Sequence, residues 1–153
     1  MAEQRHSPSG AAFTTLLLEV FRLNGRLLAA GDGLTADLGL TSARWQVLGA
    51  IEAEGLSVAQ IARAMGLARQ SVQRLADLLV DEGIVAYRDN PEHQRAKLVE
   101  LTSEGRRKLD KLNRRQIAWA NAIARGVSAA ELKSAHRVLR SLGAALDRSA
   151  REA

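Results

Sequence analysis

The sequence predicts a mainly α-helical fold with one small β-hairpin, and three observations predict it. Apolar residues recur every three or four positions along most of the 153-residue chain, which is the period of an α-helix. Two helix patterns meet at a short turn around Gly66. After Gly83 the pattern changes to the alternation typical of β-strands, and helical spacing resumes after Gly105.

The composition is that of one ordinary domain that buries an apolar core, since 46% of the residues are hydrophobic. Cysteine is absent, which excludes a disulfide framework, a thiolate metal site and a cysteine nucleophile. Residues 1–10 are polar, lack the apolar block of a secretory signal and predict a disordered lead-in. No apolar run reaches the roughly 18 residues of a membrane span. We therefore expect a soluble, cytoplasmic protein with no membrane partner.

The first predicted helix covers residues 11–30. Its apolar residues at helical spacing are Phe13, Leu16, Leu17, Val20, Phe21, Leu27 and Leu28, with Leu18 and Leu23 widening the face. So wide an apolar face requires more than one neighbouring element. Gly31 and Gly33 are predicted to end or loosen this helix.

A second helix is predicted to start at Thr41, whose hydroxyl is a plausible N-cap, and to stop at Gly55. Its apolar residues are Trp45, Val47, Leu48 and Ile51.

A helix-turn-helix is predicted next. Ser57 and Gln60 have the spacing of a capping box, in which each side chain satisfies a backbone donor at a helix start. The short helix that follows ends at the sharp turn of Gly66, and a second, amphipathic helix covers residues 68–82. The apolar face of this second helix consists of Val72, Leu75, Ala76 and Leu79.

A hairpin follows, with β-prone strands at residues 84–88 and 97–101 around a turn-rich tip at 89–93. Another cap at residues 102–105 opens a helix that stops near Gly126, and a second capping box at Ser128 and Glu131 opens the last helix. A helix-turn-helix followed by a two-stranded wing is a winged helix. Here it lies between apolar helices from the two ends of the chain.

At this point the chain resembles the MarR (multiple antibiotic resistance regulator) family of transcription factors over about residues 11–149. The most specific stretches are 56–62, 72–85 and 95–105. The resemblance implies a homodimer whose dimerisation helices (residues 11–36 and 106–149) intertwine, and a winged helix-turn-helix DNA-binding region at 37–105. It further implies a recognition helix in the major groove, a wing in the minor groove, and release by a small-molecule effector bound between the two regions.

Two departures from the family pattern concern DNA affinity. The wing carries His93, Gln94 and Arg95 where relatives often have an Asp-Arg-Arg run, so the acid that would orient Arg95 is missing. Ala68 stands where a Ser or Thr cap is common, which leaves a helix-terminal donor unsatisfied or free to meet a phosphate.

Candidate DNA-binding residues come from the recognition helix and the wing. Arg and Gln carry the donors and acceptors that read guanine and adenine edges, and Ser, Arg and Lys suit phosphates and the narrow minor groove. For Ser57 the cap alone is an equally good explanation. The candidates are Ser57, Arg69, Gln70, Ser71, Gln73, Arg74, Arg88, Arg95 and Lys97.

The net charge of +5 is weak support for this interpretation because of its distribution. Residues 57–105 carry six basic and seven acidic side chains, whereas residues 106–153 carry twelve basic and four acidic ones. The basic stretch at 106–115 is interpreted as a solvated helix face that attracts DNA without reading it.

An enzyme, a metal site and a cofactor are not expected. His6, His93 and His136 are scattered, and no nucleophile motif, phosphate loop or paired metal ligands occur. The ligand-binding residues of the effector site remain open. Arg22, Arg44, Trp45 and Trp119 are the large or charged side chains available for it, although core packing is favoured for both Trp residues.

The sequence thus predicts a dimeric, sequence-specific DNA-binding regulator, most simply a repressor, whose partner is a pseudo-palindromic operator in double-stranded DNA. The alternative is a winged-helix module that binds another protein and has no specific affinity for DNA.

Overall fold

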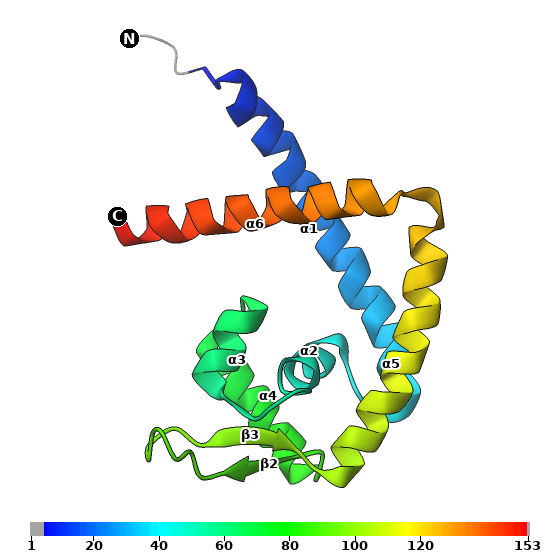
Figure 1. Cartoon of the computed structure of the whole chain (residues 1–153), viewed down its shortest axis with the longest axis vertical. Helices are drawn as coiled ribbons and strands as arrows, with labels where there is room; N and C mark the ends of the chain where they lie inside the picture. Colours follow the sequence, from blue (N-terminus) through cyan, green and yellow to red (C-terminus); the bar gives the residue numbers. More distant parts are fainter. Residues whose placement is uncertain (1–4, 153) are drawn as a thin grey trace. The chain divides into compact units, whose positions relative to one another are not determined.

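The computed structural model describes residues 5–152 and confirms the predicted fold class, a mainly α-helical chain with a small antiparallel sheet (Figure 1). It forms two compact units that divide within one helix, between Asn113 and Arg114. The elements in chain order are α1 (Pro8–Thr35), η1 (Ala36–Leu38), α2 (Ser42–Ala50), β1 (Leu56–Ser57), α3 (Val58–Met65), α4 (Arg69–Asp81), β2 (Val85–Arg88), β3 (Leu98–Leu101), α5 (Ser103–Ile123), η2 (Ala124–Gly126) and α6 (Ala129–Glu152).

Helix α1 starts earlier than predicted. Ser7 caps it by accepting a hydrogen bond from Gly10 N at 3.1 Å, and Pro8 stands in its first turn, where a missing N–H costs nothing. The prediction of a disordered lead-in was therefore wrong for residues 8–10, and its residues 1–4 lie outside the described part of the chain.

Helix α1 also ends later than predicted, because it continues through Gly31 and Gly33 to Thr35. Gly31 allows α2 to approach closely instead of ending the helix: a Cβ there would lie 2.2 Å from Ser42 Oγ. Ser42 Oγ donates to the carbonyl of Leu28 at 2.6 Å, and Ser42 N donates to Asp32 at 2.7 Å.

Helix α2 starts after Thr41 as predicted, with Arg44 N donating to Thr41 Oγ1 at 3.3 Å. It ends at Ala50, so the stop predicted at Gly55 was wrong. Gly55 instead packs against β3, where a Cβ would lie 2.5 Å from Glu100 Cγ. Trp45 packs against the core, as favoured.

Helices α3 and α4 form the predicted helix-turn-helix. Gln60 N donates to Ser57 Oγ and Ser57 N donates to Gln60 Oε1, which completes the capping box. Gly66 ends α3 in the left-handed conformation at φ 64°, which costs glycine little.

The sheet has three strands, in the order β1-β3-β2, instead of the two that were predicted. The added strand β1 pairs antiparallel with β3, with Leu56 opposite Val99 and Ser57 opposite Leu98. The residues just before α3 therefore also hold the part of β3 that lies next to the hairpin tip.

One core joins the winged helix to the start of α5. The fully buried side chains come from α2, α3, α4, the sheet and α5, and include Leu48, Ile51, Ile61, Leu79, Leu109 and Leu112. Lys108 Nζ donates to the carbonyl of Leu38 at 2.6 Å, which ties α5 to η1. The first half of α5 thus belongs to the same packed body as the winged helix.

The second unit contains α6, which opens with the predicted capping box of Ser128 and Glu131. Hydrogen bonds from the hydroxyl and the backbone N–H of Ser128 lower the pKa of Glu131. Leu132, Leu139 and Leu146 repeat every seven residues on α6 and are 47%, 47% and 61% exposed. Helix α1 likewise exposes Leu18, Phe21 and Leu23. None of the described helices has the length and hydrophobicity needed to cross a membrane.

Candidate nucleic-acid interface

A hollow of about 590 Å³ lies between the start of α3, the exposed side of α4 and the wing. Two Arg and one Lys are among its lining residues, so it is a basic surface. The lining residues are Ser57, Val58, Ala59, Arg69, Gln70, Gln73, Tyr87, Arg95, Ala96 and Lys97.

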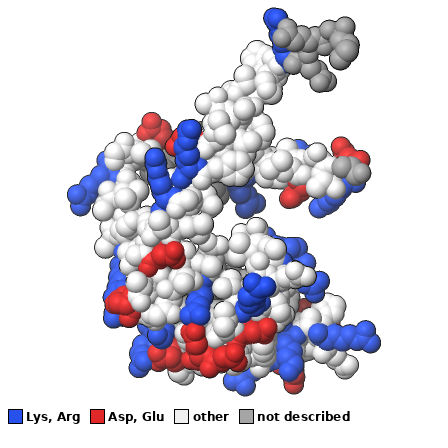
Figure 2. All heavy atoms as spheres, turned by 180° about the vertical axis from the view of Figure 1, so that it is seen from behind, with Lys and Arg blue, Asp and Glu red and all other residues white. Residues whose placement is uncertain are grey.

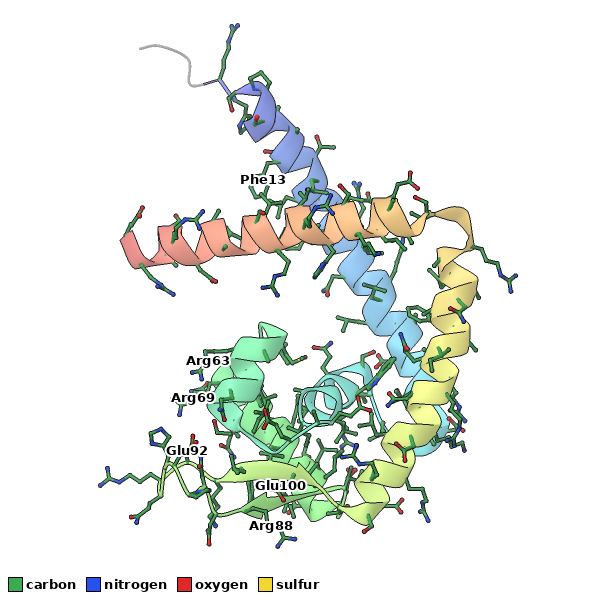
Figure 3. All side chains as sticks on the ribbon, in the orientation of Figure 1. Phe13, Arg63, Arg69, Arg88, Glu92 and Glu100 are labelled. Atoms are coloured by element: carbon green, nitrogen blue, oxygen red, sulfur yellow. The ribbon has the colours of Figure 1, made fainter. Side chains whose placement is uncertain are left out.

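The buried face of α4 fixes which of its side chains reach this hollow. Val72, Ala76 and Leu79 are fully buried and Leu75 packs partly against the same core, so the other positions of this stretch face outward. Arg69, Gln70, Gln73 and Arg74 are all exposed, as predicted, and Arg69 stands above the hairpin in Figure 3.

The first turn of α4 has no side-chain cap. Ala68 occupies the N-cap position and makes no side-chain hydrogen bond there, so its departure from the family pattern has the expected structural effect. Unpaired N–H groups and the positive end of the helix dipole favour an anion at this end. Arg69 follows immediately and adds a full positive charge to the same end.

Gln73 is tied to the wing through Tyr87, a contact that the sequence did not predict. The Gln73 amide nitrogen donates to Tyr87 Oη at 2.8 Å and to Asp77 Oδ1 at 2.9 Å, and Tyr87 Oη donates to Asp77 Oδ1 at 2.5 Å. Burial, together with the hydrogen bond to Asp77 and its negative charge, raises the pKa of Tyr87 to about 12. Gln73 and Tyr87 are 14 residues apart on different elements, so no local pattern could reveal the contact.

The wing contributes unequally to the hollow. Arg95 and Lys97 line it, whereas Arg88 points away from it below the hairpin in Figure 3, near Glu100 at 3.8 Å. Arg95 makes no ion pair with any other residue that the structure describes, in keeping with the missing wing acid. It is therefore available to a partner.

Six of the nine predicted residues thus lie together: Ser57, Arg69, Gln70, Gln73, Arg95 and Lys97. Ser71, Arg74 and Arg88 do not line the hollow. Ser57 is only 8% exposed, and its hydroxyl donates to Gln60 Oε1 at 2.8 Å and accepts from Gln60 N at 3.4 Å, so the capping box fully explains its position.

Acidic and basic side chains are mixed on the surface, as the count along the chain predicts. On the side shown in Figure 2, acidic side chains gather over the lower part of the molecule and basic ones border them. Within residues 5–152, no group of three His, Asp or Glu side chains is arranged to hold a metal ion. Arg44, considered for an effector site, instead pairs with Glu82.

Comparison with known proteins adds an independent finding. A model of the MarR family matches residues 38–96, from the end of η1 to the wing. The uncharacterized protein Rv2011c of Mycobacterium tuberculosis is 40% identical over 131 residues, which cover 86% of this chain and 92% of that protein. The transcriptional activatory protein BadR of Rhodopseudomonas palustris is 29% identical over 116 residues, which cover 69% of this chain and 66% of BadR.

Among solved structures, CouR from Rhodococcus jostii RHA1 bound to p-coumaroyl-CoA is 29% identical to this chain, with a TM-score of 0.75. The match covers 83% of this chain and 90% of CouR. It therefore extends well beyond the residues of the winged helix.

Proposed function

Because the chain belongs to the MarR family of transcription regulators, we propose that it is a homodimeric, sequence-specific DNA-binding repressor that a small-molecule effector releases from its operator. In this proposal α4 enters the major groove and the wing reaches the adjacent minor groove. Residues 37–105 form the DNA-binding region, and residues 11–36 and 106–149 form the dimerisation helices.

One observation carries the proposal for DNA: the base-reading side chains of α4 and the basic side chains of the wing border the same hollow. Arg69, Gln70 and Gln73 come from the helix, and Arg95 and Lys97 from the hairpin. A duplex offers base edges and phosphates within a few ångströms of each other, which is what such a mixed surface recognises. The uncapped start of α4 adds backbone donors for a phosphate.

The proposal of a homodimer rests on apolar surface that one chain leaves uncovered. The stripe of Leu132, Leu139 and Leu146 on α6, and the leucines and Phe21 on α1, are too exposed to serve as the core of a single chain. A seven-residue apolar repeat is typical of helices that pack against other helices. A symmetric pair of chains would also present two copies of α4 to the two half-sites of an operator.

Release by an effector is supported by CouR, whose structure contains p-coumaroyl-CoA. Whether the protein represses or activates transcription needs its own test, because BadR is named as an activatory protein. Repression requires only that the bound dimer cover the promoter. A promoter-reporter assay with and without the gene measures the sign directly.

The test of DNA recognition is selection of bound duplexes from a random pool by the full-length protein. We expect a two-fold symmetric consensus and a steep loss of affinity as salt rises. The variant Arg69→Ala/Arg74→Ala should then lose about hundredfold in affinity for that consensus while keeping its helix content.

A matched control removes the same charge elsewhere. Arg137→Ala/Arg140→Ala takes two arginines from exposed positions of α6, and its affinity should change by less than about threefold. Equal losses in the two double variants would assign the affinity to net charge, and a pool with no enriched sequence would favour the protein-binding module instead.

A further inference from the structure

The hydrogen bonds among Gln73, Asp77 and Tyr87 have one allowed direction. An ionised carboxylate only accepts, so the phenol of Tyr87 and the amide of Gln73 must both donate to Asp77 Oδ1, at 2.5 and 2.9 Å. Since the Tyr87 proton is then used, Tyr87 Oη accepts from the same Gln73 nitrogen at 2.8 Å. The amide nitrogen of Gln73 is thereby turned toward two acceptors, Asp77 and Tyr87.

The other end of the amide remains open. Gln73 Oε1 has no hydrogen bond from any residue that the structure describes, and Gln73 lines the hollow beside Gln70 and Arg69. An amide held in this orientation turns its nitrogen toward Asp77 and Tyr87 and presents its oxygen, an acceptor, to a partner in the hollow. A free glutamine would present both.

In the major groove an isolated hydrogen-bond acceptor selects different bases from those that a complete amide group selects. Adenine N6 and cytosine N4 carry donors, whereas guanine and thymine present acceptor oxygens at the same place, which repel another acceptor. A complete amide prefers adenine, because it can also donate to adenine N7.

We propose that Tyr87 and Asp77 are specificity-determining residues that lock the amide of Gln73, so that it accepts either adenine or cytosine at one position of each operator half-site. This proposal rests on the proposed function, because it assumes that α4 reads base edges. Tyr87 acts through Gln73 and is a positioning residue. Its place on β2 means that the wing takes part in setting the base preference of the recognition helix.

The protonation of Tyr87 is consistent with a Gln73 amide that keeps one orientation. The pKa of Tyr87 is raised to about 12, so the phenol keeps its donor proton throughout the physiological range. Among the described residues, Gln70 has no comparable tether, although it lies one helical turn before Gln73. The two glutamines of the hollow should therefore read bases by different rules.

The experiment compares consensus sequences selected by the full-length protein and three variants. Gln73→Met removes both the donor and the acceptor, so the half-site position at which its discrimination disappears is the position that Gln73 reads. Tyr87→Phe removes one of the two acceptors that hold the Gln73 nitrogen and keeps the aromatic ring. Asp77→Ala removes the other acceptor at an exposed helix position, which keeps the test sound if the wing does not tolerate Phe.

At the position that Gln73→Met identifies, the unmodified protein should select adenine and cytosine within about threefold of each other. Tyr87→Phe and Asp77→Ala should each raise the ratio of adenine to cytosine there by about tenfold, while preferences elsewhere in the half-site stay the same. A merely structural role for Tyr87 would weaken binding at all positions alike.

The inference would be overturned, with the proposed function intact, by a strict preference for adenine in the unmodified protein or by an unchanged ratio in both variants. A consensus that is insensitive to Gln73→Met would do the same, because Gln73 would then read no base. If the unmodified protein selects no consensus at all, both the inference and the proposed function fail.

Discussion

Arg44 on α2 forms an ion pair with Glu82 at the end of α4, with 2.9 Å between Arg44 Nη2 and Glu82 Oε1. The side chain of Arg44 is only 17% exposed, and it also donates to the carbonyl of Gly39 at 3.1 Å. One guanidinium therefore joins the turn before α2 to the end of α4.

This pair should stabilise the winged helix modestly. We expect Arg44→Met to lower the free energy of unfolding by about 1 kcal/mol, because the apolar stem is kept while the two polar contacts are lost. Glu82→Gln should cost about half as much, since the amide can still accept a hydrogen bond. Urea unfolding at a fixed protein concentration measures both, and a larger loss for Glu82→Gln would contradict the assignment.

Tyr87 is the single tyrosine of the chain, so its ionisation can be followed directly by ultraviolet absorbance. We expect a pKa of about 12 in the folded protein, with burial as the main cause, and a lower value in Asp77→Ala, where burial still raises the pKa and the hydrogen bond with Gln73 still lowers it.

The raised pKa of Tyr87 has a defined effect on stability. The folded state holds its proton more tightly than the unfolded chain, whose tyrosine titrates near 10. The stabilisation is therefore fully present below about pH 10 and disappears as the pH rises toward about 12. Unfolding midpoints of the unmodified protein and Tyr87→Phe should converge over this range, and parallel curves would contradict the coupling.

Arg95 should act in the minor groove. We expect Arg95→Ala to reduce affinity about tenfold for operators with A·T-rich flanks and less for G·C-rich flanks, because a narrow A·T groove attracts an inserted arginine. Arg88→Ala removes the same charge from the same hairpin but outside the hollow, and its smaller effect should not depend on the flanks. If both variants respond identically to the flanking sequence, the wing contributes only diffuse attraction.

The stripe on α6 should hold the dimer together. Leu139→Glu places a charge at its centre and should shift the protein from two chains to one in light scattering at micromolar concentration. Ala144→Glu adds the same charge on the opposite side of the helix and should leave a dimer. A dimer that survives Leu139→Glu would remove α6 from the interface.

Most helices could be predicted from the sequence because their signals are local. The capping boxes at Ser57 and Ser128 and the turn at Gly66 each depend on residues within four positions of one another. The helix ends predicted at two glycines were wrong because these glycines serve tertiary packing. Gly31 and Gly55 make room for Ser42 and Glu100, which a local pattern cannot indicate. The sequence shows where each glycine stands but not which distant residue will pack against it.

The candidate site could also be predicted only where its residues follow from local patterns or from the resemblance. The residues of α4 and the wing follow from the periodicity and the resemblance, and the hollow brings six of the nine candidates together. The tether from Gln73 to Tyr87 was not predictable, because it depends on how the sheet packs beside α4. The same holds for β1, whose two residues pair with a strand about 40 positions away.

Strand β1 has a consequence for how this protein can change over evolution. Because its residues Leu56 and Ser57 pair with Val99 and Leu98, the part of β3 next to the hairpin tip is anchored to the chain entering α3. The hairpin tip at residues 89–97 lies beyond this anchor and makes no strand pairing. Insertions or deletions in the tip should therefore alter how far the wing reaches without disturbing the helix-turn-helix. Under the proposed function, a change of loop length alone would then alter which operator is bound.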